Sequence, residues 1–389
     1  MSQPFARADV TLSNWREWPF NQWSFAHVSE LIPCAVLGSG VESATDSPGD
    51  AALRDIAIDY PGGAGRVSAL DHLSTSHADC FAALKDGRIV AEWSAPHGST
   101  VAPHLIFSIT KSVTGMLAGI AAGDGALDPD APVSDYVEVR PGSAYADCRV
   151  RHLLDMSVSL DFVENYLDKA GPFDRYRRAM LWNPQRPDAP AETMRQVLAD
   201  LPRATRAHGD IFYYASPDTD MMGLVLEAAT GRRWSDYLAE RLWTPMGARG
   251  PALVTVDSVG SARAAGGLSV TARDLARFGQ LVLDDGVAPD GRRLIPSSWI
   301  ADMRTGGDQR AWLAGDFKAD FPNGNYRSYW YAAGDANGSF CGIGIHGQWL
   351  WCDPARRVVL VRFSSRPLPT DDDSTHKEIA ALSQVANAL

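Results

Sequence analysis

The chain has 389 residues, a hydrophobic content of 45% and a formal net charge of −11 at pH 7. This length allows two ordinary domains or one large composite domain. The acidic balance argues against nucleic acid or an anionic membrane surface as a partner. No apolar run approaches the roughly 20 residues of a transmembrane helix.

Three further absences narrow the class of protein. Residues 1–7 lack the apolar core of a signal peptide, which favours a cytoplasmic location. No zinc spacing and no H-E-x-x-H motif occurs, so we expect neither a metal nor a cofactor. A G-x-S-x-G nucleophile elbow is also absent, which argues against an α/β-hydrolase. The cysteines are odd in number and scattered, and we expect free thiols at Cys34, Cys80, Cys148, Cys341 and Cys352.

The first hundred residues predict an arm, a loop and a hairpin. Trp15, Trp18 and Trp23 supply large aromatic surfaces, which favours an N-terminal arm packed on the body of the protein. Residues 38–66 are rich in Gly, Ala, Ser and Pro and predict a loop. Residues 80–93 predict a β-hairpin around an Asp-Gly turn.

The most informative pattern is a serine with a lysine three positions later. Ser108 and Lys111 follow the apolar run 105–107 and open the helix-like stretch 112–120. Positions i and i+3 share a helix face, so the lysine amine is expected beside the serine hydroxyl. The free N–H groups of a helix N-terminus favour developing negative charge. A serine nucleophile needs these two features, a nearby base and oxyanion donors.

The same spacing occurs again at Ser374 and Lys377, directly after three aspartates. Little chain remains there to supply catalytic partners. Serine is a preferred N-cap residue, so this copy predicts a helix cap on a solvated acidic loop.

Residues 108–250 are mostly helical in pattern. Tyr214-Ala215-Ser216 lies just before a helix at 221–229, which Gly231 ends. A tyrosine beside a lysine ammonium and a helix N-terminus would form a phenolate more readily and could act as a general base. The alternative is a core tyrosine with a satisfied hydroxyl.

Strands return near the C-terminus. Thr271 begins a helix, with Asp274 in the position that a capping box gives to Glu. Residues 348–352 and 358–363 predict a second hairpin. A final helix places four apolar residues on one stripe, Ile379, Leu382, Val385 and Leu389.

A glycine-rich segment, 342–347, precedes the first strand of that hairpin. Such glycines allow a ligand or another backbone to approach closely, and a free N–H there could bind an oxyanion. A sheet edge or bulge is the alternative. His346 in this segment suggests a triad base, but a satisfied interior histidine is the better interpretation.

The order of these elements predicts an α+β fold. Residues 1–107 supply the N-terminal arm and the first sheet strands, and 251–389 supply the remaining strands and the C-terminal helix. These two parts are expected to form one subdomain whose antiparallel sheet has flanking helices. Residues 108–250 form an inserted, mostly helical region that carries Ser108, Lys111 and Tyr214.

Together, the three motifs resemble those of the serine β-lactamase and penicillin-binding-protein superfamily, S-x-x-K, Y-x-N or Y-x-S, and K-T-G. Residues 123–136, 151–157 and 230–248 also resemble stretches of its class C branch. Within the superfamily the chain is most similar to the 6-aminohexanoate-dimer hydrolase (nylon-oligomer hydrolase) family. That similarity rests on residues 21–27, 155–161, 164–166 and 342–348.

The resemblance implies roles for individual residues. Ser108 would be the nucleophile, and Lys111 and Tyr214 the base pair. The backbone N–H groups of Ser108 and Ile345 would form the oxyanion hole. Four residues would contact the substrate: Tyr166 on a flap over the scissile amide, Trp182 near that flap, Gly344 and Ser216.

The chain departs from the family pattern in two places. Gly342-Ile343-Gly344 stands in the K-T-G position, so a β-lactam carboxylate would lose its usual lysine and hydroxyl partners. The flap region carries Arg175, Arg177 and Arg178. A substrate ammonium would need a carboxylate there, and the candidates are Glu164, Asp168 and Asp174.

We therefore expect a serine hydrolase that cleaves small linear amides, such as 6-aminohexanoate oligomers, through an acyl-enzyme. The alternatives are a carboxylesterase for short-chain esters, a β-lactamase or DD-peptidase, and a non-catalytic module that binds acyl ligands. The expected partner is a small-molecule amide or ester, with no nucleic acid and no membrane. A homodimer is a possible assembly.

Overall fold

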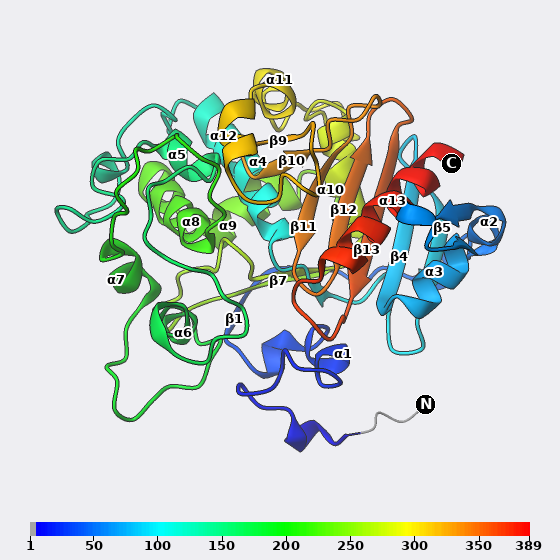
Figure 1. The fold of residues 1–389 in the computed structure, drawn as a ribbon, viewed down its shortest axis with the longest axis horizontal. Coiled ribbons are helices and arrows are strands. Elements are labelled where there is room, and N and C mark those ends of the chain that lie inside the picture. Colours follow the sequence, from blue (N-terminus) through cyan, green and yellow to red (C-terminus); the bar gives the residue numbers. More distant parts are fainter. Residues whose placement is uncertain (1–4) are drawn as a thin grey trace.

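A seven-stranded antiparallel sheet forms the centre of the molecule in a computed structural model that describes residues 5–389. The strand order is β5-β4-β13-β12-β11-β10-β9 (Figure 1). Both ends of the chain contribute, as predicted. The strands are β4 (Ala78–Lys85), β5 (Arg88–Ser94), β9 (Asn325–Arg327), β10 (Trp330–Ala332), β11 (Phe340–Gly344), β12 (Gln348–Asp353) and β13 (Val358–Ser364).

Both predicted hairpins are present, and local turn chemistry accounts for the first. Asp86 and Gly87 join β4 to β5 with φ values of 49° and 76°, the left-handed pair that a tight hairpin turn requires. Strand β12 pairs with β13 in antiparallel register, as expected. Every residue of β13 is buried, because helices cover both faces of the sheet.

Helices pack on the two faces of this sheet. On one face lie α10 (Ala272–Leu283) and α4 (Ile109–Gly123), and on the other lie α3 (Ala69–Thr75) and α13 (Asp372–Ala388). In Figure 1, α13 passes in front of the sheet and α10 behind it. Thr271 caps α10 as predicted, accepting from the N–H of Asp274 at 3.0 Å. The capping box was wrong, however, because the Asp274 carboxylate instead accepts from the N–H groups of Arg249 and Gly250.

The inserted region is helical, as its pattern indicated. Its longest helix is α8 (Ser216–Thr230), which ends at Gly231 in the left-handed conformation, with φ of 66°. Helix α8 packs against α4, so the segments that carry Ser108 and Tyr214 are neighbours. The other helices are α5 (Val150–Leu154), α6 (Gly171–Ala179), α7 (Met194–Ala199) and α9 (Trp234–Leu238), and α11 (Ser297–Thr305) and α12 (Gln309–Ala314) follow later in the chain.

A second sheet was not predicted. Four short antiparallel strands lie in the order β1-β7-β8-β6. They are β1 (Cys34–Ser39), β7 (Pro251–Thr255), β8 (Leu268–Val270) and β6 (His104–Leu105). Strands of two to six residues carry little periodicity, and only their long-range pairing defines them.

The loop prediction for residues 38–66 was partly wrong. This segment contains α2 (Ala51–Asp55) and β2 (Ala57–Asp59), which pairs with β3 (Arg66–Ser68). Tertiary contacts stabilise these short elements. Leu53 and Ile58 are fully buried, and the Gln384 side chain of α13 hydrogen-bonds both the N–H and the carbonyl of Asp59 at 2.9 Å.

The N-terminal arm packs on the body as expected. Trp15 is fully buried and its Nε1 donates to the Trp182 carbonyl at 3.0 Å. After it, α1 (Asn21–Ser24) contacts the end of the main sheet, because Asn21 Nδ2 donates to the carbonyls of Ser365 and Arg366. Trp18 is instead 52% exposed.

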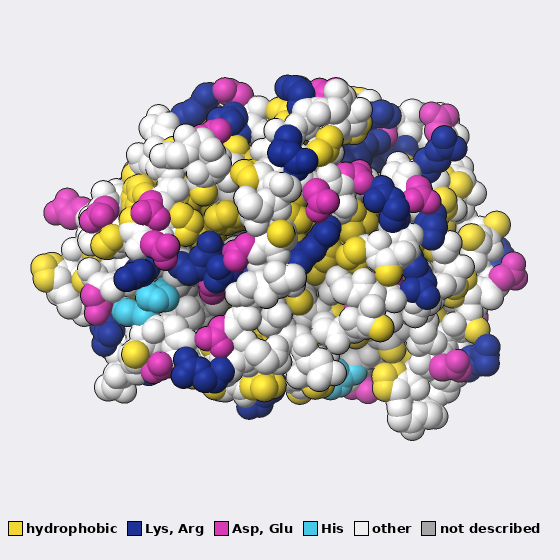
Figure 2. All heavy atoms as spheres, turned by 90° about the horizontal axis from the view of Figure 1, so that it is seen from above, with side chains coloured by type: hydrophobic (Ala, Val, Ile, Leu, Met, Phe, Trp, Pro, Cys, Tyr) yellow, Lys and Arg dark blue, Asp and Glu magenta, His cyan; other side chains and the backbone are white. Residues whose placement is uncertain are grey.

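Three surface and composition features complete the fold. All five cysteines are free, as predicted. Among the helices of residues 5–389, none combines the length and the apolar character needed to cross a bilayer. Acidic and basic side chains are interspersed over the face drawn in Figure 2.

Candidate active site

Ser108 is the N-cap residue of α4, and its side chain contacts the lysine one turn later. Lys111 Nζ donates to Ser108 Oγ at 2.8 Å and to the Ala265 carbonyl at 2.7 Å. The i, i+3 spacing thus produces the predicted contact. Phe107, just before the serine, has a φ of 45°, an uncommon value for a bulky residue that turns the chain from β6 into α4.

The environment of Lys111 makes its amine a usable base. The side chain is buried, and this burial lowers the pKa of Lys111 from 10.5 to about 7. The positive charge of Arg263 also lowers the pKa, while the carboxylates of Glu164 and Asp220 oppose the shift. A large fraction of the amine is therefore neutral near pH 7, and a neutral amine can accept the Ser108 proton.

Tyr214 lies beside the same lysine, but not as a phenolate. Lys111 Nζ is 5.0 Å from the centroid of the Tyr214 ring. Burial raises the pKa of Tyr214, the negative charge of Glu164 raises it further, and the neighbouring Ser108 hydroxyl opposes the rise. The phenolate prediction was wrong, because desolvation outweighs any stabilisation by the ammonium. Tyr214 is present as a phenol, which can donate and relay a proton.

Two backbone N–H groups at the Ser108 cavity come from different parts of the fold. Ser108 and Ile345 line one cavity. Within residues 5–389, neither the Ser108 N–H nor the Ile345 N–H has a hydrogen-bond acceptor. Two free donors beside a nucleophile are the arrangement that stabilises an oxyanion.

The glycines of β11 explain how Ile345 reaches Ser108. A Cβ on Gly342 would lie 2.8 Å from Ser112 Oγ of α4, and one on Gly344 would lie 2.6 Å from the Ile106 carbonyl. Only glycine allows the strand to lie this close to the segment that carries the serine. The glycines therefore serve backbone approach, and the edge alternative does not apply because β11 is an interior strand.

The cavity at Ser108 has a volume of about 530 Å³. Its walls combine aromatic and aliphatic side chains, as small-molecule sites do. They include the predicted residues Tyr166, Tyr214 and Gly344. Its acidic side chains are Glu164, Asp316, Asp320 and Asp372.

Glu164 connects two of the predicted substrate-binding residues. Its carboxylate accepts from the N–H and the hydroxyl of Ser216, both at 2.7 Å, and from the Tyr166 hydroxyl at 2.9 Å. Ser216 begins α8, where a carboxylate is favoured by the helix dipole. The structure thus brings Tyr166 and Ser216 together through a residue that the sequence offered only as a partner for an ammonium.

Trp182 lies on another wall of the site. It borders a small void, about 20 Å³, that Ser108 also lines. Its ring contacts Phe107 edge-on, with centroids 6.0 Å apart, and its Nε1 donates to Thr255 Oγ1 at 3.1 Å. The Arg263 guanidinium lies 4.8 Å from the ring centroid.

The sequence analysis did not identify the residues that position the Ala265 backbone, to which Lys111 donates. Asp220 on α8 accepts from the Ala265 N–H at 2.8 Å, and its other oxygen contacts Arg263 and Tyr176. Since Ala265 also accepts from Lys111, Asp220 positions the loop that orients the lysine. One signal existed, since Asp218 and Asp220 directly precede the apolar run of α8 and aspartate is rarely buried unless its charge is paired.

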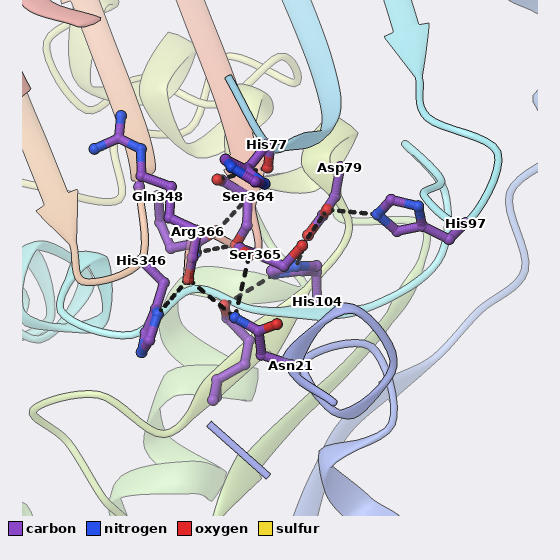
Figure 3. A network of polar contacts seen from close by, with 12 residues as sticks. Asn21, His77, Asp79, His97, His104, His346, Gln348, Ser364, Ser365 and Arg366 are labelled. Atoms are coloured by element: carbon purple, nitrogen blue, oxygen red, sulfur yellow. Dashed lines mark hydrogen bonds and ion pairs between the residues drawn. The ribbon is translucent and has the colours of Figure 1, made fainter. Parts of the chain in front are cut away.

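His346 follows Ile345 of the Ser108 cavity, and Figure 3 shows its ring beside Arg366 in a network of polar contacts. Its Nδ1 donates to the Arg366 carbonyl at 2.7 Å. Burial lowers the pKa of His346 to about 4, and the nearby cations Arg16, Arg177 and Arg366 lower it further. Through Asn21 and Ser365 the contact with Arg366 continues to Asp79, which also hydrogen-bonds His97 and His104. These contacts match the interpretation of His346 as a satisfied interior residue.

Fold and site together define a hydrolase with a serine nucleophile motif. The family model described as "Beta-lactamase" matches residues 66–384. The curated 6-aminohexanoate-dimer hydrolase of Paenarthrobacter ureafaciens is 36% identical over 372 residues, 95% of this chain and 91% of that protein. The chain therefore belongs to the beta-lactamase family and, within it, to the group of the 6-aminohexanoate-dimer hydrolases.

Solved structures share the fold. One is "Putative 6-aminohexanoate-dimer hydrolase from Bacillus anthracis", with a TM-score of 0.86, 22% identity and coverage of 98% of each chain. Another is a family VIII carboxylesterase, with a TM-score of 0.58, 14% identity and coverage of 82% of this chain and 95% of that one. These likenesses confirm the predicted β-lactamase-like α+β fold.

Proposed function

We propose that this chain hydrolyses small linear amides, such as 6-aminohexanoate oligomers, through an acyl-enzyme on Ser108. One observation carries the proposal, a buried Lys111 amine with a pKa of about 7 that lies 2.8 Å from the Ser108 hydroxyl. The similarity over nearly the whole chain to an enzyme named for the 6-aminohexanoate dimer supports the substrate class.

Acylation uses the groups already in place. Neutral Lys111 accepts the proton as Ser108 Oγ attacks the scissile carbonyl. The N–H groups of Ser108 and Ile345 stabilise the negative charge on the carbonyl oxygen. The Tyr214 hydroxyl donates its proton to the departing amine and is reprotonated from Lys111, so the amine leaves neutral and Ser108 carries the acyl group.

Deacylation reverses the roles. Water enters the position that the amine vacated, and neutral Lys111, through Tyr214, removes a proton as the water attacks the ester. The same two N–H groups stabilise the second oxyanion. The carboxylic acid leaves and the proton returns to Ser108, so the enzyme is regenerated unchanged.

The third motif position favours linear substrates over β-lactams. Ile343 and Gly344 line the cavity where the superfamily has a lysine and a hydroxyl. Removing one charge-assisted hydrogen bond costs about 1.5–3 kcal/mol, roughly tenfold to a hundredfold in kcat/KM. Ester hydrolysis is the alternative function, and the fold shared with a family VIII carboxylesterase makes it the necessary comparison.

A substrate panel combined with mass spectrometry tests the proposal. The panel compares the 6-aminohexanoate dimer, short p-nitrophenyl esters and a chromogenic cephalosporin. We expect dimer hydrolysis and an acyl adduct on Ser108 that is absent in Ser108→Ala. Ester turnover without dimer turnover would assign a carboxylesterase, and absence of any adduct or turnover would leave only a binding module.

A further inference from the structure

Two arginines beside the candidate active site have no carboxylate partner. Within the described chain, neither Arg16 nor Arg177 lies within 4 Å of an acidic oxygen. Both Nη atoms of Arg177 donate to the Tyr166 carbonyl at 3.0 Å. Arg16 donates to the Trp182 carbonyl at 3.0 Å and to Asn183 Oδ1 at 2.5 Å. Neutral acceptors therefore satisfy part of each guanidinium, and no carboxylate of residues 5–389 pairs with either one directly.

Other arginines near Arg177 do form ion pairs with carboxylates, so the lack of a carboxylate partner is particular to Arg16 and Arg177. On α6, Arg175 forms two hydrogen bonds to Glu192, at 2.6 and 2.8 Å, and Arg178 bonds Asp174 at 3.1 Å. Arg186 also reaches Asp174, at 3.0 Å. Arg177 lies between two paired arginines on the same short helix and is the one that turns toward the site.

Holding two such cations together is unfavourable for the folded protein. Only 6% of Arg177 is exposed, and burial lowers its pKa to about 10. Burial also lowers the pKa of Arg16, and the positive charges of Arg177 and Arg263 add to that shift. Carboxylates oppose the shifts without forming an ion pair, Glu17 and Asp174 at Arg16 and Glu164 and Asp174 at Arg177. A buried cation without a directly paired counter-ion is unfavourable. An anion between the two guanidinium groups would remove this penalty.

The cavities place these arginines next to the nucleophile. Arg16 and Arg177 line the small void that Ser108 and Ile345 also line. The two arginines also line a larger outer cavity of about 550 Å³, which Tyr166 borders as well. The arginines therefore lie one small void from the nucleophile, and a substrate arm that widens this void would bring its end to them.

Resting on the proposed function, we infer that Arg16 and Arg177 bind a carboxylate at one end of the linear substrate. The preferred substrates are thus amides or esters that carry an anionic group a few methylenes from the scissile bond. The planar guanidinium suits this task, since it presents paired donors to a carboxylate. The remaining N–H groups of the two side chains provide those donors.

Two matched ester pairs test this inference on either side of the scissile bond. Mono-p-nitrophenyl adipate against p-nitrophenyl hexanoate places the carboxylate on the acyl side. The butyrate ester of 6-hydroxyhexanoate against hexyl butyrate places it on the leaving side. We expect the wild-type enzyme to prefer the anionic member of at least one pair by about tenfold or more in kcat/KM.

Variants then locate the preference. Arg16→Gln and Arg177→Gln should each reduce the anionic-to-neutral ratio about tenfold, whereas Arg177→Lys should retain part of it. Arg175→Gln is the matched control, because it removes the same charge from the same helix but lines none of the three cavities. It should keep the wild-type ratio. A ratio is used because Arg177 also holds the Tyr166 carbonyl, so absolute rates can change for that reason.

The outcomes separate this inference from the proposed function. If the wild-type enzyme hydrolyses neither the neutral esters nor the 6-aminohexanoate dimer, the proposed function fails. If it hydrolyses the neutral esters and shows no preference for either anionic partner, or if Arg16→Gln and Arg177→Gln keep the preference, the inference is overturned. Inhibition of neutral-ester hydrolysis gives a second readout that needs no variant. Hexanoate should inhibit the wild-type enzyme more strongly than hexylammonium, and the reverse order would contradict the anion site.

Discussion

The chain contains the same S-x-x-K spacing in two environments. At the start of α4, Lys111 Nζ contacts Ser108 Oγ at 2.8 Å, and the lysine is buried while the serine lines the cavity. At the start of α13, the side chains turn away from each other. Ser374 Oγ donates to Asp371 and Lys377 Nζ donates to Asp373, each at 2.6 Å.

The difference lies in the surroundings rather than in the motif. The Lys377 side chain is 34% exposed, and its hydrogen bond with Asp373 raises its pKa, so it remains an ammonium. Burial does the opposite at Lys111. The predicted N-cap role of Ser374 was also wrong, because Asp371 is the N-cap and Ser374 lies in the first turn. Helical spacing brings two residues to one face, whereas desolvation decides whether the amine can act as a base.

The largest expected difference between the two S-x-x-K copies is the effect of replacing their serines. Ser108→Ala should lower kcat/KM for every substrate by about a thousandfold or more, since loss of a nucleophile costs several orders of magnitude. Ser374→Ala should leave kcat/KM within about twofold of the wild-type value, as expected for a residue outside the acting unit. Both are measured with purified protein whose unfolding temperature is checked. Equal activity of the two variants would reject the assignment of Ser108.

Next in size is the loss at the base. Lys111→Ala and Tyr214→Phe should each lower kcat/KM by about a hundredfold or more, and the double variant should be little worse than either, because residues that act as one unit are not additive. Lys377→Ala serves as the control with the same spacing to a serine. Additive losses for Lys111 and Tyr214 would show that they act separately.

The acidity of Lys111 predicts a pH profile of intermediate size. The neutral amine is the reactive form, so kcat/KM should rise with pH through about 7 and level off above it. Glu164 raises the pKa of Lys111, so Glu164→Gln should move the midpoint to lower pH. A profile that is flat between pH 6 and 8 would indicate that Lys111 does not titrate in this range.

The smallest expected effect concerns Tyr166, a residue of the Ser108 cavity that lies outside the S-x-x-K motif. The Tyr166 hydroxyl donates to Glu164 in this structure, and its predicted role on a flap would require it to turn to the substrate amide. Tyr166→Phe should therefore lower the amide-to-ester ratio of kcat/KM by about two- to tenfold, the net value of one hydrogen bond. Esters have a better leaving group and need less help. The same assays should rank the cephalosporin below the linear substrates, and an unchanged ratio would remove Tyr166 from the reaction.

The features that were predictable are local ones. The Asp86-Gly87 turn, the apolar stripe of α13 and the Gly231 end of α8 each depend on a few consecutive residues. The Ser108–Lys111 contact depends on a single helical turn. Short strands such as β1 and β6 were missed, because pairing partners far along the chain define them.

By itself, the sequence determined the helices, the hairpins, the sheet built from both chain ends and the serine that begins α4. Only the tertiary structure decided which amine is a base and where charge remains unpaired. The pKa of Lys111 depends on its burial near Ala265 and on the charge of Arg263. Arg16 and Arg177 are far apart in the sequence but line the same void. Desolvation and Coulomb interactions depend on distance in space, which the order of residues along the chain does not contain.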